Sequence, residues 1–166
     1  AFIRNIHVIN TADRPRDIKV FTYQAFAIGD SRSNTDTAQY LPDSNAILHY
    51  RGRRAFIVSG YTDDTPFDQF SIGLFGSDDH QGTFRDAEDG ELSGNVVEHG
   101  RVDSALRFSV SVDAHSSKRV HYWIAAGMNN REALYVHKQI QDNGVFDRIH
   151  ATANWWHTWL QPAIET

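Results

Sequence analysis

Apolar and polar residues alternate in short runs over the first two thirds of the chain, and a period of two is the pattern of half-buried β-strands. β-Branched and aromatic residues are frequent in these runs, as they are in strands. We predict strands at residues 2–9, 18–28, 47–50, 55–61, 69–75, 101–112 and 119–126. In the segment 101–112 the apolar side chains share one face if a bulge falls near Ser104 or Ala105.

Two pairs of these strands are predicted to form antiparallel hairpins. The turn residues that follow Thr11 join the first two strands of the series. Gly52 joins the third strand to the fourth, because glycine adopts the backbone conformation of a tight turn that other residues disfavour.

Long polar segments between the strands are predicted to be loops. Residues 30–45 are polar and contain Pro42, which is typical of irregular structure. Residues 76–100 are acidic and rich in glycine, with a short helical turn expected at 85–88.

After residue 128 the apolar period lengthens to that of an α-helix. A first helix is predicted at 131–142. The side chain of Asn129 or Asn130 can accept hydrogen bonds from its unpaired backbone N–H groups. The pair Asn143-Gly144 is predicted to end this helix with a left-handed cap.

A second helix is predicted from residue 146 to residue 160, with Pro162 as its stop. Strands followed by helices are typical of a sandwich with helices added at one end, and the strand–helix alternation of a doubly wound sheet is absent. The sequence therefore predicts a mainly β, antiparallel sandwich over residues 1–128. Residues 129–166 form a helical extension.

Tryptophans are concentrated in the second predicted helix. Trp156 aligns with Ile149 and Leu160 at helical spacing, so we expect it to anchor the helix to the sandwich. Trp155 and Trp159 share an adjacent face and are expected to point outward, against another domain or a sugar ring. We favour domain packing, because a neighbouring domain would begin near this helix.

Composition limits the classes of function. The chain of 166 residues is long enough for one domain, and its net charge of −5 does not suit a nucleic-acid binder. The one dense basic cluster, Arg51, Arg53 and Arg54, is interpreted as a hairpin turn. No apolar run is long enough to span a membrane, and the pattern of a signal peptide is absent, which favours the cytoplasm.

Carboxylates in the predicted loops are interpreted as solvated side chains, and we assign no catalytic residue. A glycosidase needs two carboxyl groups in different environments, so that one of them stays protonated. The sequence does not show that any two of these acids share a cleft. The acids considered are Asp63, Asp64, Asp68, Asp78, Asp79, Asp86, Glu88, Asp89 and Glu91.

No metal or cofactor is predicted. The chain has no cysteine, its nine histidines lack the spacing of metal ligands, and the segment 86–90 departs from the EF-hand calcium loop. His7, His49 and His121 lie in predicted strands and are interpreted as hydrogen-bonded core or surface residues.

Several segments, in this order along the chain, resemble the β-domain of archaeal and bacterial family 15 glycoside hydrolases, which include glucoamylases, glucodextranases and trehalases. The segments are 2–10 (FIRNIHVIN), 20–21 (VF), 37–40 (TAQY), 47–50 (ILHY), 90–95 (GELSGN), 99–105 (HGRVDSA), 123–127 (WIAAG) and 154–160 (NWWHTWL). The resemblance implies an antiparallel, galactose-mutarotase-like supersandwich that precedes a catalytic barrel of paired α-helices.

The resemblance also implies that two glutamates in the barrel perform an inverting hydrolysis. No position of this chain matches their motifs, so no catalytic residue is carried over. The chain lacks strands that usually open this domain, so we expect an incomplete sandwich that self-association could stabilise.

Three hypotheses follow. The first is a non-catalytic domain that supports a helical barrel of the same polypeptide, the barrel acting on α-glucans or oligosaccharides. The second is a carbohydrate-binding module, with Trp155 and Trp159, or Tyr40 and Tyr50, as sugar contacts. The third is a mutarotase-like enzyme that uses a histidine and a carboxylate.

Overall fold

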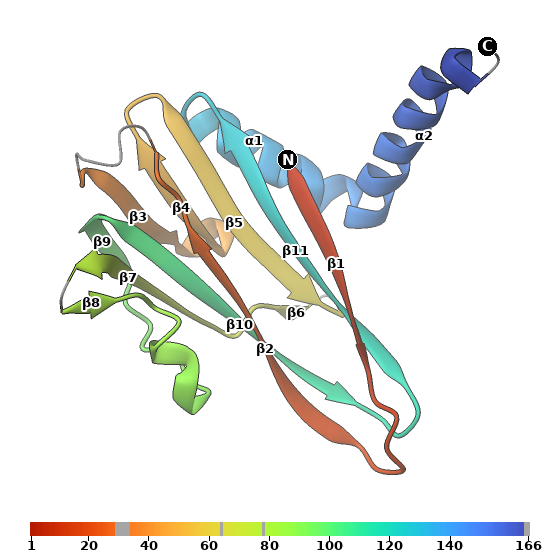
Figure 1. Cartoon of the computed structure of the whole chain (residues 1–166), viewed down its shortest axis with the longest axis horizontal. Coiled ribbons are helices and arrows are strands. Elements are labelled where there is room, and N and C mark those ends of the chain that lie inside the picture. Colours follow the sequence, from red (N-terminus) through yellow and green to blue (C-terminus); the bar gives the residue numbers. More distant parts are fainter. Residues whose placement is uncertain (29–33, 64, 78, 165–166) are drawn as a thin grey trace.

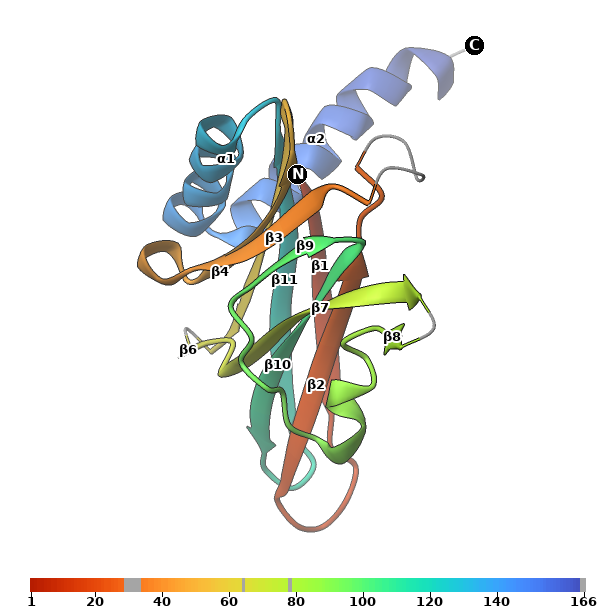
Figure 2. The same cartoon turned by 90° about the vertical axis from the view of Figure 1, so that its left-hand side faces the viewer.

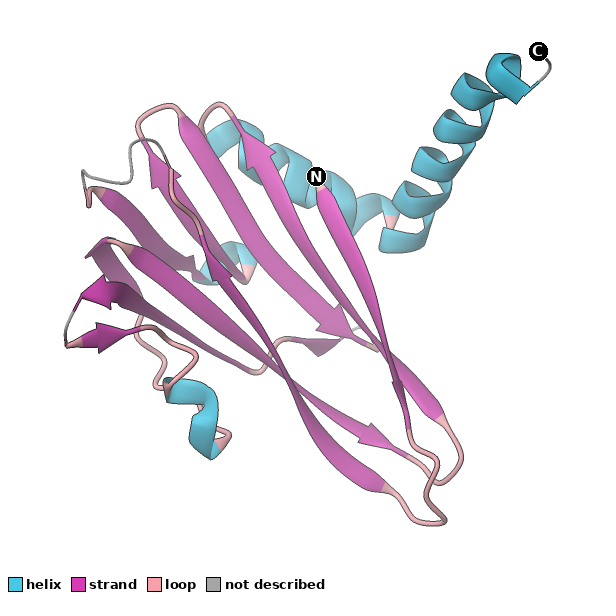
Figure 3. Ribbon diagram, in the orientation of Figure 1, coloured by secondary structure: helices cyan, strands magenta, loops and turns pink. Residues whose placement is uncertain are grey.

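The computed structural model describes residues 1–28, 34–63, 65–77 and 79–164. Two antiparallel sheets pack face to face and two helices follow them (Figures 1 and 3). The predicted fold class, a mainly β sandwich with C-terminal helices, is therefore confirmed.

The larger sheet has seven strands, in the order β1-β11-β5-β4-β3-β9, with β6 paired to β5. Its strands are β1 (Phe2–Ile9), β3 (Asp36–Leu41), β4 (Ala46–Arg51), β5 (Arg54–Thr62), β6 (Thr65–Pro66), β9 (Val97–Gly100) and β11 (Ser117–Gly127).

The smaller sheet has four strands, in the order β2-β10-β7-β8. Its strands are β2 (Arg16–Ala25), β7 (Gln69–Ser77), β8 (His80–Gln81) and β10 (Val102–Val112). Two 3-10 turns, η1 (Pro42–Ser44) and η2 (Asp86–Asp89), lie in the connections, and η2 is the helical turn that the sequence predicts.

The main core lies between the two sheets. Leu106 and Phe108 of β10 meet Val58 of β5 and Tyr122 of β11 there, and all four are buried. A side chain at Gly60 would collide with the Phe108 ring, since its Cβ would lie 2.7 Å from Cζ. The glycine therefore allows the two sheets to approach closely at this point.

A second core lies between the larger sheet and α1 (Asn130–Asn143), on the side away from the smaller sheet (Figure 2). Trp123 of β11 is 1% exposed, and its Nε1 donates a hydrogen bond to Nδ1 of His137, 3.1 Å away. As the sequence predicts, the Asn129 side chain caps α1 by accepting from the backbone N–H of Glu132 at 2.9 Å. Gly144 ends the helix, but its φ of 81° and ψ of 149° differ from the predicted left-handed cap.

The predicted hairpin between the first two strands is wrong. β1 pairs with β11 in the larger sheet, whereas β2 pairs with β10 in the smaller one. The connection between β1 and β2 therefore crosses from one sheet to the other. The hairpin of β4 and β5 around Gly52, with φ of 53°, is confirmed.

Four further expectations need correction. The predicted loop at 30–45 contains β3, and the predicted loop at 76–100 contains β8 and β9; residues 30–33 and 78 of these loops lie outside the described part. β10 pairs with β2 in an unbroken register, so no bulge occurs near Ser104. The second helix, α2 (Val145–Ile164), continues through Pro162 instead of stopping before it.

Candidate functional site

The helix α2 projects from the sandwich (Figure 1), and its outer half carries a cluster of exposed tryptophans. Trp155, Trp156 and Trp159 are 58%, 48% and 62% exposed. The rings of Trp155 and Trp159 lie parallel with centroids 6.2 Å apart, and Trp156 meets both edge-on. Together with Leu160, which is also exposed, they form an apolar surface that no described residue covers.

The expectation that Trp156 anchors α2 to the sandwich is wrong. Among the described residues, the first turns of α2 contact the domain, through buried Val145 and half-buried Ile149 in the second core and through Phe146, whose ring meets His121 edge-on. Every position from 150 to 161 is exposed. The periodicity correctly identifies the residues that share a face, but that face is not covered by this sandwich.

The two tyrosines considered as sugar contacts lie against the cores. Tyr40 of β3 stacks on Phe70 with centroids 4.1 Å apart, and its hydroxyl donates to Oδ1 of Asn45 at 2.8 Å. Tyr50 of β4 is half-buried and packs against the second core. Neither tyrosine lies beside the tryptophans of α2.

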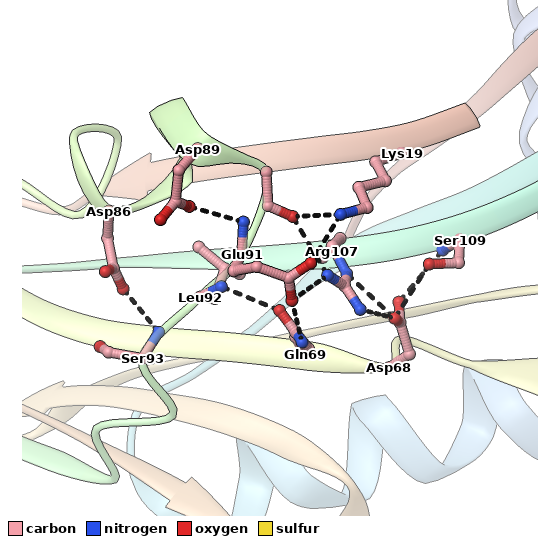
Figure 4. A network of polar contacts seen from close by, with 11 residues as sticks. Lys19, Asp68, Gln69, Asp86, Asp89, Glu91, Leu92, Ser93, Arg107 and Ser109 are labelled. Carbon is pink, nitrogen blue, oxygen red and sulfur yellow. Dashed lines mark hydrogen bonds and ion pairs between the residues drawn. The ribbon is translucent and has the colours of Figure 1, made fainter. Parts of the chain in front are cut away.

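Carboxylates gather on the outer face of the smaller sheet around Arg107 of β10 (Figure 4). Its guanidinium donates to Oδ2 of Asp68 at 2.5 Å and to Oε2 of Glu91 at 2.7 Å. Lys19 of β2 also binds Glu91, with 2.6 Å between Nζ and Oε1. The predicted solvated acids thus include two that form ion pairs with a buried arginine.

These ion pairs keep both carboxyl groups ionised. Burial alone would raise the pKa of Asp68, but hydrogen bonds from Arg107 and Ser109 outweigh it and lower that pKa. Hydrogen bonds from Lys19, Gln69 and Arg107 lower the pKa of Glu91 to about 2. A general acid must be protonated near neutral pH, so this pair is unsuited to glycoside hydrolysis.

The same surface is held together by bonds to the segment that follows η2. Asp86 accepts from the backbone N–H of Ser93 at 2.7 Å, and Asp89 accepts from that of Glu91 at 2.9 Å. Gln69 of β7 accepts from the N–H of Leu92 at 2.8 Å. These acids fix a loop on the sheet.

Asp63 pairs with Lys118, and Glu88 pairs with Arg85. Asp64 and Asp78 lie outside the described residues.

Asp103 of β10 is a carboxyl group whose pKa is raised, mainly by burial. It is 0% exposed and accepts hydrogen bonds from the Tyr23 hydroxyl at 2.9 Å and the Thr83 N–H at 3.0 Å. A substrate cannot reach it in this arrangement. Asp103 therefore stabilises the 80–95 segment and is not positioned to act as an acid or base on a substrate.

The histidines behave mostly as interpreted. His49 is buried, its Nε2 lies 2.8 Å from the Ser104 hydroxyl, and burial lowers its pKa to about 3. His7 lies 2.9 Å from the Ser117 hydroxyl, and His121 packs against the rings of Tyr61 and Phe146. Among the described residues, no three His, Asp or Glu side chains form a group that could hold a metal ion.

A mutarotase-like centre would need a histidine and a carboxylate facing a ligand. Among the described residues, the histidine–carboxylate ion pair is that of His115 and Asp13, 2.6 Å apart, with side chains 64% and 98% exposed. It lies where two turns meet at one end of the sandwich.

No helix in the described part is long and apolar enough to cross a membrane.

Comparisons with known proteins show similarity at the level of fold. No protein-family model matches the chain, and no curated protein matches it. Among solved structures, a bacterial glucoamylase complexed with acarbose superposes with a TM-score of 0.63, over 86% of this chain, at 10% sequence identity. The match covers 20% of that glucoamylase, so this chain corresponds to about a fifth of its length.

Proposed function

We propose that this chain is a non-catalytic domain of a larger glucoamylase-like glycoside hydrolase. In this proposal, α2 packs through its tryptophans against a helical catalytic domain of the same polypeptide, and that domain hydrolyses α-glucosidic bonds. The exposed cluster of Trp155, Trp156 and Trp159 is the observation that carries the proposal.

The energetics of α2 support a covering partner. Isolated helices are marginal in water, and most helical stability in proteins comes from packing an apolar face. The outer turns of α2 carry such a face without a neighbour in the described chain. Burying an aromatic side chain contributes about 1.5–3 kcal/mol, so covering three tryptophans would stabilise the helix substantially.

Two further observations agree with a supporting role. The fold match corresponds to a fifth of a glucoamylase, which leaves most of that enzyme outside the matched region. The carboxylates that the structure brings together, Asp68 and Glu91, are bound to Arg107 and are ionised. This region therefore lacks the mixed protonation state that glycoside hydrolysis needs.

The proposal is tested by weakening the cluster in the longer polypeptide encoded by the reading frame that contains this chain. Trp155→Ala combined with Trp159→Ala should lower the temperature at which its glucosidase activity is lost, because the two domains lose a packed interface. Tyr135→Ala is the matched control, since Tyr135 is an aromatic residue of α1 that is 64% exposed.

Equal inactivation temperatures for the tryptophan double variant and the control would overturn the packing role. If maltooligosaccharides protected these tryptophans from oxidation in the isolated chain, the cluster would instead be assigned to sugar binding.

A further inference from the structure

A hollow of about 510 Å³ lies on the outer face of the larger sheet, where β1, β11 and β5 meet the first turn of α2. The strand register places His7 of β1 opposite Arg119 of β11. It also places Tyr61 of β5 opposite His121 of β11. Directly opposed residues share a face of the sheet, and the intervening Val120 points into the main core. These four side chains therefore point away from the main core and line the hollow together.

The guanidinium of Arg119 is the cation that determines the character of this hollow. It lies over the Phe146 ring, with 5.4 Å between Cζ and the ring centroid. The His121 ring meets the same Phe146 ring edge-on, with centroids 5.1 Å apart. Among the described residues, no carboxylate lies within ion-pair distance of Arg119, and no acceptor takes a hydrogen bond from its side chain. Arg119 is thus positioned by a ring contact that leaves its N–H donors available.

Further donors lie around Arg119. Nε2 of His7 and the hydroxyl oxygen of Ser117 are 2.9 Å apart, and both residues line the hollow. Lys118 pairs with Asp63, the one carboxylate among the described lining residues. Because this ion pair balances its own charges, Arg119 leaves the lining with an excess of positive charge. The whole chain has a net charge of −5, so the cationic hollow is a local feature.

We propose that this hollow binds the phosphate group of a small phosphate monoester. Such a group carries a charge of about −1.5 to −2 at pH 7 and three strong acceptor oxygens. An arginine binds it through parallel N–H bonds, and Lys118, His7 and Ser117 supply donors from other sides. A carboxylate has only two oxygens and a single charge, so it would use fewer of these donors.

The hollow also has room for the organic part of the ester. Phe146 is 42% exposed, so part of its ring offers an apolar surface beside Arg119. The volume falls within the roughly 300–1,000 Å³ typical of small-molecule sites. The site lies on the sandwich and at the base of α2, and it does not depend on the proposed packing role of the tryptophans.

Backbone and arginine side-chain N–H chemical shifts of the ¹⁵N-labelled chain, titrated with phenyl phosphate at constant ionic strength, test the proposal. We expect saturable shifts centred on His7, Ser117, Arg119 and Phe146, with a Kd in the millimolar range. Inorganic phosphate should bind more weakly than phenyl phosphate, because it has no ring to pack on Phe146.

Variants of Arg119 separate recognition from general charge. Arg119→Ala should weaken binding of phenyl phosphate about tenfold, which corresponds to about 1.4 kcal/mol. Arg119→Lys should lie between the two, because it keeps the charge but not the guanidinium fork. Arg131→Ala is the matched control, since it removes one positive charge from an exposed arginine of α1 outside the hollow, and it should leave the Kd unchanged.

Benzoate is the carboxylate probe in the same titration. Benzoate binding as tightly as phenyl phosphate would overturn the assignment to a phosphate group. Inorganic phosphate binding as tightly as phenyl phosphate would assign the hollow to free phosphate and overturn the assignment to an ester. Equal Kd values for Arg119→Ala and Arg131→Ala, or no saturable shifts at concentrations about ten times a millimolar Kd, would overturn the site itself.

Discussion

At the residue scale, Arg107 determines what the acidic side chains of the smaller sheet can do. Its side chain is 10% exposed and binds Asp68 and Glu91, which lie 39 and 16 positions away in the sequence. Residue types reveal neither this pairing nor its effect on pKa, because both depend on which strands become neighbours. The sequence shows many acids in loops but not that two of them share one cation.

The pKa shifts around Arg107 predict how stability depends on pH. The folded chain holds Asp68 and Glu91 below their ordinary pKa values of 3.8 and 4.5, so the unfolded state binds more protons in acid. Both carboxylates contribute their full stabilisation of the fold at pH values above those ordinary pKa values. This stabilisation is lost as the pH falls, and for Glu91 the loss continues to a pH of about 2. The melting temperature, measured at a series of pH values from 7 to 2, should therefore fall less steeply below pH 4.5 in Glu91→Gln than in the unmodified chain.

Asp147→Asn controls for the removal of one negative charge, because Asp147 lies on α2 outside this network. If the melting temperatures of the unmodified chain and of Glu91→Gln fell in parallel as the pH was lowered, the lowered pKa assigned to Glu91 would be contradicted.

Asn10 is a second residue whose role depends on distant partners. It is 4% exposed, and its Nδ2 lies within 3.0 Å of the carbonyl oxygens of Arg14, Val112 and Asp113. Asn10→Ala should reduce the free energy of unfolding by about 2–3 kcal/mol, because buried carbonyls lose their donor. Urea denaturation measures this loss. Asn5→Ala, on the exposed part of β1, should cost at most roughly 0.5 kcal/mol. Equal costs at the two positions would be inconsistent with a hydrogen-bonding role for Asn10.

At the element scale, the sequence predicts which segments are strands and helices better than it predicts their partners. The strands β1 and β2 are each correctly located, but alternation cannot reveal that they join different sheets. β3 was missed because it lies in a polar segment next to Pro42, although Ala38 and Tyr40 show the alternation of a strand. Proline near the end of α2 removes one backbone donor without ending the helix.

The position of α2 predicts an order of stability for tryptophan variants of this chain. Trp155→Ala, Trp156→Ala and Trp159→Ala should each cost about 1 kcal/mol or less, because all three side chains are exposed. Trp123→Ala should cost about 3–5 kcal/mol, because it leaves a cavity between β11 and α1. Urea denaturation of the four variants gives the order. A loss at Trp156 comparable to that at Trp123 would instead restore the anchoring role expected from helical spacing.

At the scale of the whole molecule, the sandwich provides two outer faces with different roles. On the larger sheet, α1 covers part of the outer face and leaves the hollow at the base of α2. On the smaller sheet, the network around Arg107 fastens the 80–95 segment. Composition and periodicity predict the sandwich and its helices. They cannot predict these faces, because each one combines residues from strands far apart in the sequence.

The whole-molecule account predicts that the chain does not release glucose from maltose, maltooligosaccharides, isomaltose or trehalose. Asp68 and Glu91 are ionised and Asp103 is covered, so these three carboxyl groups do not form an acid–base pair around a substrate. A coupled glucose assay on protein free of contaminating glycosidase measures this. Activity that disappears on mutating a single residue of the chain would contradict the prediction.

The most direct measurement of the central claim is tryptophan oxidation, resolved by peptide mass spectrometry, in this chain and in the longer polypeptide that the proposed function implies. Trp123 is 1% exposed and serves as the internal reference in both proteins. We expect Trp155, Trp156 and Trp159 to oxidise readily in this chain and to be protected in the longer polypeptide. Oxidation at the same rate in both proteins would show that no domain covers α2, and would contradict the proposed packing role.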